Sequence, residues 1–246
     1  EEGAREIWDI NRAGLKNLGS RWLPVRRPEL YAGDVFQTLS RAAGLVLPAP
    51  EIIADLPPDA AEIARLDSPP LRDILHGMME YSTNLTAEMV GLHASGAGDL
   101  PASARAMQDW AASRGIPALD LRDHSGMSPE TRVTARAMAQ VIASLGDRAD
   151  LRGLMKRVPL QQRKDRAAPE GLRLDAKTGT LNFVSNLAGY GSVPGRGEVI
   201  FAIYISDMTR RAATEGQELP KGVIGWTSRA KLLQQDLVAG WIGRYA

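Results

Sequence analysis

Apolar side chains recur at helical spacing in several stretches of the first two thirds of the chain. Positions 71, 74, 75, 78 and 79 form one stripe of leucine, isoleucine and methionine, which predicts a helix ending near Tyr81. A capping serine or aspartate with prolines at 67–70 predicts the start of that helix. The same spacing predicts helices over residues 31–43, 85–92, 101–114 and 134–145.

The last third of the chain changes to a β-rich pattern. Strands are predicted over residues 172–177, 184–193 and 198–206, with Gly195-Arg196-Gly197 as a hairpin turn between the last two. A closing helix is predicted over residues 228–245. A helical block followed by an antiparallel sheet and a terminal helix indicates the α+β class. The segment 198–206 is apolar on both faces, so we expect it in the middle of a sheet with neighbours on each side.

Composition removes several classes of function. Thirty basic and twenty-nine acidic side chains give a net charge of +1, which provides no electrostatic basis for binding nucleic acid or an anionic membrane. The sequence has no apolar run of membrane-spanning length. The 246 residues include no cysteine, which excludes disulfides, thiolate metal sites and a cysteine nucleophile. The chain starts without methionine and without a visible signal peptide.

Two short motifs carry candidate chemistry. Ser82-Thr83-Asn84 falls at the predicted break between two helices, where side chains can point into a cleft. Lys177-Thr178-Gly179 stands at the start of a segment that reads as a buried strand. Taken alone, the first motif is typical of a helix cap, and the second of an ordinary strand start with a solvated lysine.

Neither the histidines nor one polar loop indicates a further functional site. Asp123 begins a polar loop, residues 123–128, that is typical of a turn closed by an aspartate side chain. His76 and His93 lie on predicted helices without a second ligand nearby, so no metal site is expected. His124, in the loop, is expected at the surface.

Taken in order, three segments resemble one family. Residues 68–90, 121–142 and 176–190 are similar to the D-alanyl-D-alanine carboxypeptidase/endopeptidase family, the low-molecular-mass class C penicillin-binding proteins. The resemblance runs from about Tyr31 to the C-terminus. It implies the fold shared by penicillin-binding proteins and serine β-lactamases, an antiparallel sheet flanked by helices. It also implies an acyl-transfer site built from S-x-x-K, S-x-N and K-T-G motifs, with no cofactor and no metal.

The resemblance assigns roles to individual residues. Ser82 is similar to the serine that relays a proton to the leaving amine, and Asn84 to the amide that holds the substrate peptide bond. Lys177 is similar to the lysine that polarises that serine and attracts the substrate's terminal carboxylate. The remaining residues correspond to groups that bind the carboxylate or let a substrate strand approach the backbone: Thr178, Gly179 and Thr180. The N–H of Thr180 is similar to one donor of an oxyanion hole.

The chain departs from the family at the nucleophile. No S-x-x-K precedes Ser82, and the only instance, Ser228–Lys231, follows K-T-G and is interpreted as a coincidence. We therefore expect a C-terminal portion of the enzyme, with residues 1–30 as the tail of an inserted or accessory region. Residues 31–246 are then the C-terminal part of the penicillin-binding domain, whose sheet is incomplete at its N-terminal side.

The resulting functional expectation is specific. The protein is expected to be a periplasmic serine D-Ala-D-Ala carboxypeptidase/endopeptidase whose nucleophile lies in a missing N-terminal segment. Its expected partners are peptidoglycan peptides, β-lactams and that segment, and the isolated chain is expected to be inactive. Two alternatives are a non-catalytic peptidoglycan-binding module with a degenerate site and a β-lactamase of the same fold.

Overall fold

The chain divides into two compact units, Glu1–Leu66 and Asp67–Ala246. The structure is a computed structural model that describes residues 7–9, 25–116, 119–147, 149–161 and 170–246. Most of residues 1–30, predicted to be irregular, lie outside the described residues. The predicted domain boundary after residue 30 falls inside the first unit, and that division stays a prediction.

The first unit contains one described helix, α1 (Pro28–Ala42). Its bounds confirm the helix predicted over residues 31–43, with proline in the first turn, where the missing N–H costs nothing. Gly44 follows with a φ of 88°, a left-handed conformation that ends helices and that glycine adopts without strain. Residues 45–66 form no helix or strand, and they include the proline-rich stretch 45–58, for which a loop or an extended link is predicted.

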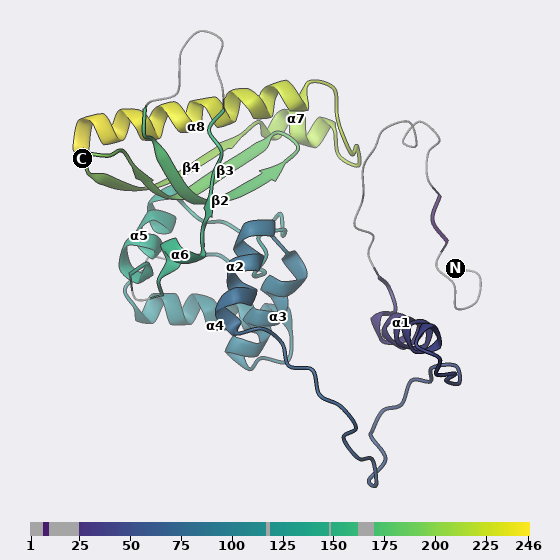
Figure 1. The fold of residues 1–246 in the computed structure, drawn as a ribbon. Coiled ribbons are helices and arrows are strands. Elements are labelled where there is room, and N and C mark those ends of the chain that lie inside the picture. Colours follow the sequence, from purple (N-terminus) through teal and green to yellow (C-terminus); the bar gives the residue numbers. More distant parts are fainter. Residues whose placement is uncertain (1–6, 10–24, 117–118, 148, 162–169) are drawn as a thin grey trace. The chain divides into compact units, whose positions relative to one another are not determined.

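The second unit is a four-stranded antiparallel sheet with helices on both faces (Figure 1). The strand order is β1-β2-β3-β4, so each strand pairs with its neighbour in sequence. The strands are β1 (Lys156–Arg157), β2 (Arg173–Leu181), β3 (Val184–Ser192) and β4 (Glu198–Ser206). The helices are α2 (Leu71–Tyr81), α3 (Asn84–Ser95), α4 (Leu100–Ser113), α5 (Ala135–Leu145), α6 (Leu151–Leu154), α7 (Met208–Ala213) and α8 (Val223–Tyr245).

The helix α8 covers one face of the sheet (Figure 1). Val238 and Ile242 of α8 are fully buried against Leu172, which precedes β2, and against a cluster of strand residues, namely Leu174, Ala176, Leu187, Phe201 and Ile203. On the other face, Tyr190 of β3 packs with Ile142 of α5, and Met79 of α2 joins the same cluster. Burial of apolar surface on both faces therefore fixes the helices to the sheet. The α+β class and the helix-flanked antiparallel sheet are confirmed.

The predicted helices are present, with three corrections. The helix α2 begins at Leu71, the first residue of the predicted apolar stripe, but its N-cap is Pro70 and no side chain caps it, so the expected capping by Ser68 or Asp67 is wrong. Proline there disfavours helical backbone at residue 69, which delays the helix past the predicted capping residues. The helix α8 begins at Val223, before the predicted residue 228, and α7 was not predicted.

The strand that carries K-T-G is longer than predicted. It was expected to end at Lys177, but β2 continues to Leu181, so Lys177-Thr178-Gly179 lies inside the strand rather than at its start. Pairing of every residue from 173 to 181 with β3 satisfies the backbone and overrides the weak strand propensity of the polar stretch. The β3–β4 hairpin forms at the predicted turn, where Gly195 has a φ of 74°.

Candidate active site

Ser82 lies at the break between α2 and α3, as predicted. It is the C-cap residue of α2, and its backbone is left-handed, with φ 55° and ψ 50°. A non-glycine residue in this region carries strain of about 1 kcal/mol or more. Asn84 is the first residue of α3, and the side chains of both Ser82 and Asn84 are exposed. The strained turn thus presents the hydroxyl and the amide to solvent instead of to a helix face.

The K-T-G segment lies in the C-terminal half of strand β2. Cross-strand pairing places Lys177 opposite Ala188 and Thr178 opposite Leu187, so the lysine faces α2 and α5 while the threonine faces α8. Strand β1 pairs only with Asp175 and Ala176. In the described part of the chain, the outer edge of β2 from residue 177 to residue 181 has no strand partner. An edge of this kind can accept an extended peptide by backbone hydrogen bonding.

Gly179 is not required by packing within the chain. A Cβ built on it meets only the side chain of Asn186, at an ordinary contact distance of 3.5 Å. Its φ does not lie in the left-handed region, so no turn or bulge demands glycine there either. The conformation therefore gives no internal reason for the glycine and leaves room for a ligand backbone to approach the strand.

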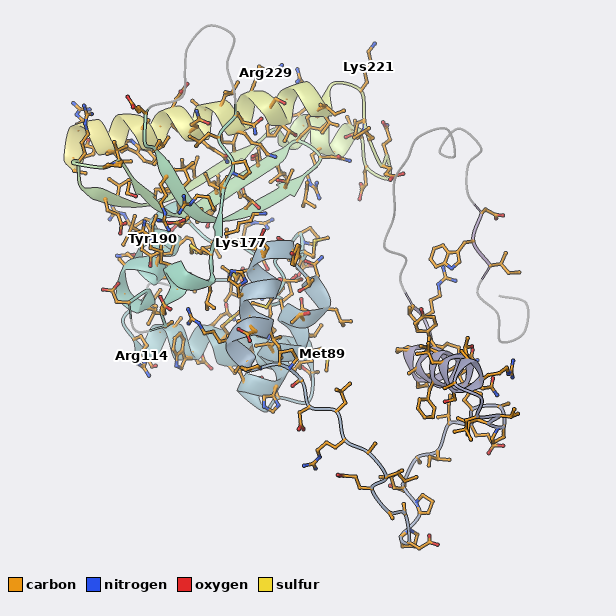
Figure 2. The ribbon with its side chains drawn as sticks, in the orientation of Figure 1. Met89, Arg114, Lys177, Tyr190, Lys221 and Arg229 are labelled. Atoms are coloured by element: carbon orange, nitrogen blue, oxygen red, sulfur yellow. The ribbon has the colours of Figure 1, made fainter. Side chains whose placement is uncertain are left out.

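Lys177 brings the two motifs together. Its ammonium Nζ donates a hydrogen bond to Ser82 Oγ and a second one, of 2.7 Å, to the carbonyl oxygen of Thr178. It lies where the sheet meets α2 (Figure 2). Burial lowers the pKa of Lys177, and the nearby positive charge of Lys156 lowers it further. A lysine with a lowered pKa that contacts the hydroxyl of a serine in a strained turn is a typical arrangement for proton transfer.

Two neighbouring pockets lie on the threonine side of β2. The smaller, of about 180 Å³, is lined by both threonines of the motif, Thr178 and Thr180, and by Lys156 and Lys231. The larger, of about 840 Å³, shares Thr180 and Lys231 and also contains Ser228. Two hydroxyls and two ammonium groups make the smaller pocket suited to a carboxylate.

The predicted site residues are only partly assembled by direct contact. Ser82 and Lys177 are hydrogen-bonded, and Asn84 stands two residues from Ser82. Ser228 is exposed on α8, across the sheet from α2. Among the described residues, no group of three or more histidines, aspartates or glutamates could hold a metal ion.

The surface position predicted for His124 is wrong. Its side chain is half-buried, and its Nε2 shares a 2.7 Å hydrogen bond with the fully buried hydroxyl of Ser103. The imidazole ring lies against α3 at Gly91, where a Cβ would come within 2.4 Å of the ring. The backbone N–H groups of His124 and Ser125 donate to the carboxylate of Glu88 on α3. These partners are distant in sequence, so local pattern could not find them.

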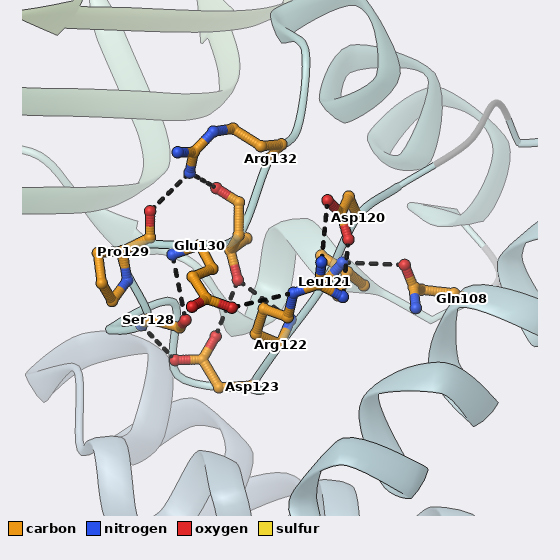
Figure 3. Close-up of polar contacts among 10 residues, drawn as sticks. Gln108, Asp120, Leu121, Arg122, Asp123, Ser128, Pro129, Glu130 and Arg132 are labelled. Atoms are coloured by element: carbon orange, nitrogen blue, oxygen red, sulfur yellow. Dashed lines mark hydrogen bonds and ion pairs between the residues drawn. The ribbon is translucent and has the colours of Figure 1, made fainter.

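The rest of this loop is organised by Asp123, as predicted (Figure 3). Its carboxylate accepts hydrogen bonds from the backbone N–H groups of Gly126 and Ser128 and from the hydroxyl of Thr131. An aspartate that binds its own following backbone stabilises a tight turn. The loop therefore has a structural role beside the site.

Comparison with known proteins decides the family. The sequence pattern of the D-Ala-D-Ala carboxypeptidase 3 (S13) family matches residues 15–229. The chain belongs to this family. Members are D-Ala-D-Ala carboxypeptidases, which are serine peptidases. The family predicted from the three segments is thus confirmed.

Two curated relatives extend the comparison. A carboxypeptidase from Mycobacterium tuberculosis is 33% identical over 182 residues, which cover 67% of this chain and 39% of that protein. A D-alanyl-D-alanine carboxypeptidase from an Actinomadura species is 29% identical over 201 residues, covering 73% of this chain and 37% of that protein. The chain spans less than two fifths of the length of these two relatives.

Solved structures show the same fold. Penicillin-binding protein 4 from Haemophilus influenzae, solved in complex with a β-lactam, matches with a TM-score of 0.62 at 22% identity, over 88% of this chain and 52% of that one. A predatory endopeptidase from Bdellovibrio bacteriovorus, in complex with an immunity protein, matches with a TM-score of 0.53 at 20% identity, over 97% of this chain and 64% of that one. The S13 chain described here has the penicillin-binding-protein fold. None of its described helices is both long and apolar enough to cross a bilayer.

Proposed function

We propose that this chain is part of a serine D-Ala-D-Ala carboxypeptidase/endopeptidase that cleaves peptidoglycan stem peptides through an acyl-enzyme. The observation that carries the proposal is the hydrogen bond from Lys177 to Ser82. It joins two of the three motifs of an acyl-transfer site beside a strand edge that has no strand partner among the described residues. The attacking serine and its lysine come from a segment outside this chain, which is the partner we propose for it.

Each group of the site has a role in this chemistry. The substrate backbone pairs with the outer edge of β2, and Gly179 allows its close approach. The terminal carboxylate enters the pocket of Thr178 and Thr180, beside the ammonium groups that line it. Asn84 holds the peptide bond, and the N–H of Thr180 is one donor to the developing oxyanion. Ser82, held by Lys177, passes the proton to the leaving amine.

The cellular setting is part of the same proposal. Peptidoglycan peptides and β-lactams, which mimic their D-Ala-D-Ala end, are the proposed ligands. Peptidoglycan lies outside the cytoplasm, so the proposed location is the periplasm. A β-lactamase is disfavoured because the matching family is that of the carboxypeptidases.

A fluorescent penicillin tests the proposal. The label is added to the longer natural protein and to this chain alone. We expect a covalent adduct on the longer protein and none on the chain, because acylation requires the serine that we place outside it. An adduct on Ser228 of the isolated chain would contradict this assignment. A longer protein that binds peptidoglycan peptides but is never acylated would instead support the alternative of a non-catalytic binding module.

A further inference from the structure

Lys156 links the two segments that carry the candidate site, although it belongs to neither motif. Its Nζ donates a hydrogen bond of 3.3 Å to the carbonyl oxygen of Glu80, two residues before Ser82. Its backbone pairs in β1 with Ala176, the residue just before Lys177. One residue therefore connects the end of α2 to the strand that bears the lysine of K-T-G.

The contact with Glu80 has a clear physical basis. The last four carbonyl groups of a helix have no partner within the helix, and that of Glu80 is among the last four of α2. The same end of a helix carries partial negative charge, which an ammonium group stabilises. Within the backbone, the N–H groups of Ser82 and Thr83 also close this end, and both donate to the carbonyl of Met78.

The charge of Lys156 also reaches Lys177. Burial is the larger cause of the lowered pKa of Lys177, and Lys156 is the charged residue that adds to it. The carboxylate of Asp175, two residues away on β2, is held by arginine side chains. Glu80 of α2 is the acidic residue nearest to Ser82 in sequence, and it contacts Lys156 through its backbone. Glu88 of α3 is occupied by the loop at residues 124–125.

We propose that Lys156 is a positioning residue of the active site: it holds the end of α2 against β2 and so sets the contact between Ser82 and Lys177. Where acylation is concerned, the inference rests on the proposed function. The structural part does not, because it concerns only contacts within this chain.

Three substitutions separate the hydrogen bond of Lys156 from its charge. Lys156→Arg keeps both, Lys156→Gln keeps a donor without charge, and Lys156→Met removes both. Amide exchange at Ser82 and Thr83 reports on the end of α2. We expect faster exchange there in the methionine variant and rates close to wild type in the arginine and glutamine variants. If the methionine variant exchanges at the wild-type rate, Lys156 does not position this turn and the proposal is wrong.

The pKa of Lys177 is a second measurement. It would not change if Lys156 had a merely structural role. The sequence has six lysines, so a chain labelled with ¹³C at lysine Cε gives few signals, and Lys177→Arg assigns the relevant one. We expect an upward shift of the Lys177 pKa in the glutamine and methionine variants, because a neighbouring positive charge is lost. The arginine variant should match wild type. The control is Lys231→Gln. It removes the other lysine of the pocket that Lys156 lines, and it should leave the pKa of Lys177 unchanged.

An unchanged Lys177 pKa in the methionine variant overturns the proposal, since loss of both the hydrogen bond and the charge of Lys156 would then leave the Ser82–Lys177 contact as it was. Penicillin labelling of the longer protein carrying the same variants is read separately. Failure of the wild-type longer protein to label would count against the proposed function alone, because exchange and titration are measured without any activity.

Discussion

The ammonium of Lys177 donates a hydrogen bond to the hydroxyl of Ser82, although 95 positions separate them in the sequence. The serine stands in a strained turn between two helices, and the lysine lies inside a strand. The turn and the strand are far apart in the sequence, so no local contact holds one against the other. The contact exists because the sheet packs against the helices, which makes it sensitive both to site substitutions and to the fold.

The first prediction concerns acylation in the longer protein that we propose. Ser82→Ala, Asn84→Ala and Lys177→Ala should each lower the rate of penicillin acylation by roughly a hundredfold or more, as losses of transition-state contacts usually do. Stopped-flow fluorescence with a labelled penicillin measures the rate. His76→Ala, at an exposed position of α2, is the control and should stay within a few-fold of wild type. Small and equal effects in all four variants would show that the site is misassigned.

A second prediction separates stability from function at Ser82. Glycine adopts the left-handed backbone of residue 82 without strain, so Ser82→Gly should raise the free energy of unfolding by about 0.5–1 kcal/mol. The same variant loses the hydroxyl and should label as poorly as Ser82→Ala. Urea unfolding measures the first effect. Equal stability of the glycine and alanine variants would mean that the turn carries no strain.

Asp175 should make the stability depend on acid pH. Burial disfavours its carboxylate, but hydrogen bonds from Arg173, Arg157 and Arg152 outweigh this and lower its pKa. The folded state therefore binds a proton less readily than the unfolded state, so this contribution is present above the ordinary aspartate pKa and is lost as the pH falls below about 4. Asp175→Asn should cost roughly 2–3 kcal/mol at neutral pH.

Urea unfolding between pH 3 and pH 7 checks this prediction. The asparagine variant should lose the decline of stability below about pH 4 that Asp175 causes. Glu198→Gln, which changes a more exposed partner of Arg152, is the matched control and should cost under about 1 kcal/mol. If both variants are equally stable, the arginine cluster does not stabilise the fold through Asp175.

Gly91 should be intolerant of a side chain. A Cβ there would lie 2.2 Å from the ring of His124, which Ser103 holds in place, so Gly91→Ala should destabilise the chain by about 1–3 kcal/mol. Gly77→Ala is the control, because nothing lies within 4 Å of its Cβ and alanine favours a helix. It should stabilise the chain by up to about 1 kcal/mol. Thermal unfolding of both variants gives the comparison, and equal effects would rule out the packing of His124 as the cause.

The last prediction concerns the edge of the sheet at β4. In the described residues β4 pairs on one side only, with β3, and its segment is apolar on both faces. An unpaired apolar strand edge favours pairing between molecules, so the isolated chain should associate or bind a further segment of the protein. Light scattering after size exclusion should give a mass above 26.6 kDa that rises with concentration. A monomer with strongly protected amides at Val199–Ile205 would contradict this.

The sequence by itself determined the longer helices, the class of the fold and the family. Helical spacing of apolar residues placed α2, α4 and α5 within a few residues of their bounds, because each helix must bury one stripe. The break at residues 82–84 was visible for the same reason, since the stripe is interrupted there. The three motif-bearing segments were sufficient to predict the family that the comparison confirmed.

Only the tertiary structure decided how these parts meet. The strand β2 runs through K-T-G because β3 pairs with all of it, a long-range interaction that overrides local propensity. His124 is held by Ser103, and Lys156 contacts Glu80, through pairs 21 and 76 residues apart in the sequence. Periodicity describes which face of an element is buried, but it contains no information on which distant residue lies against that face. The packing of the helices on the sheet supplies that information, and with it the contact between Ser82 and Lys177.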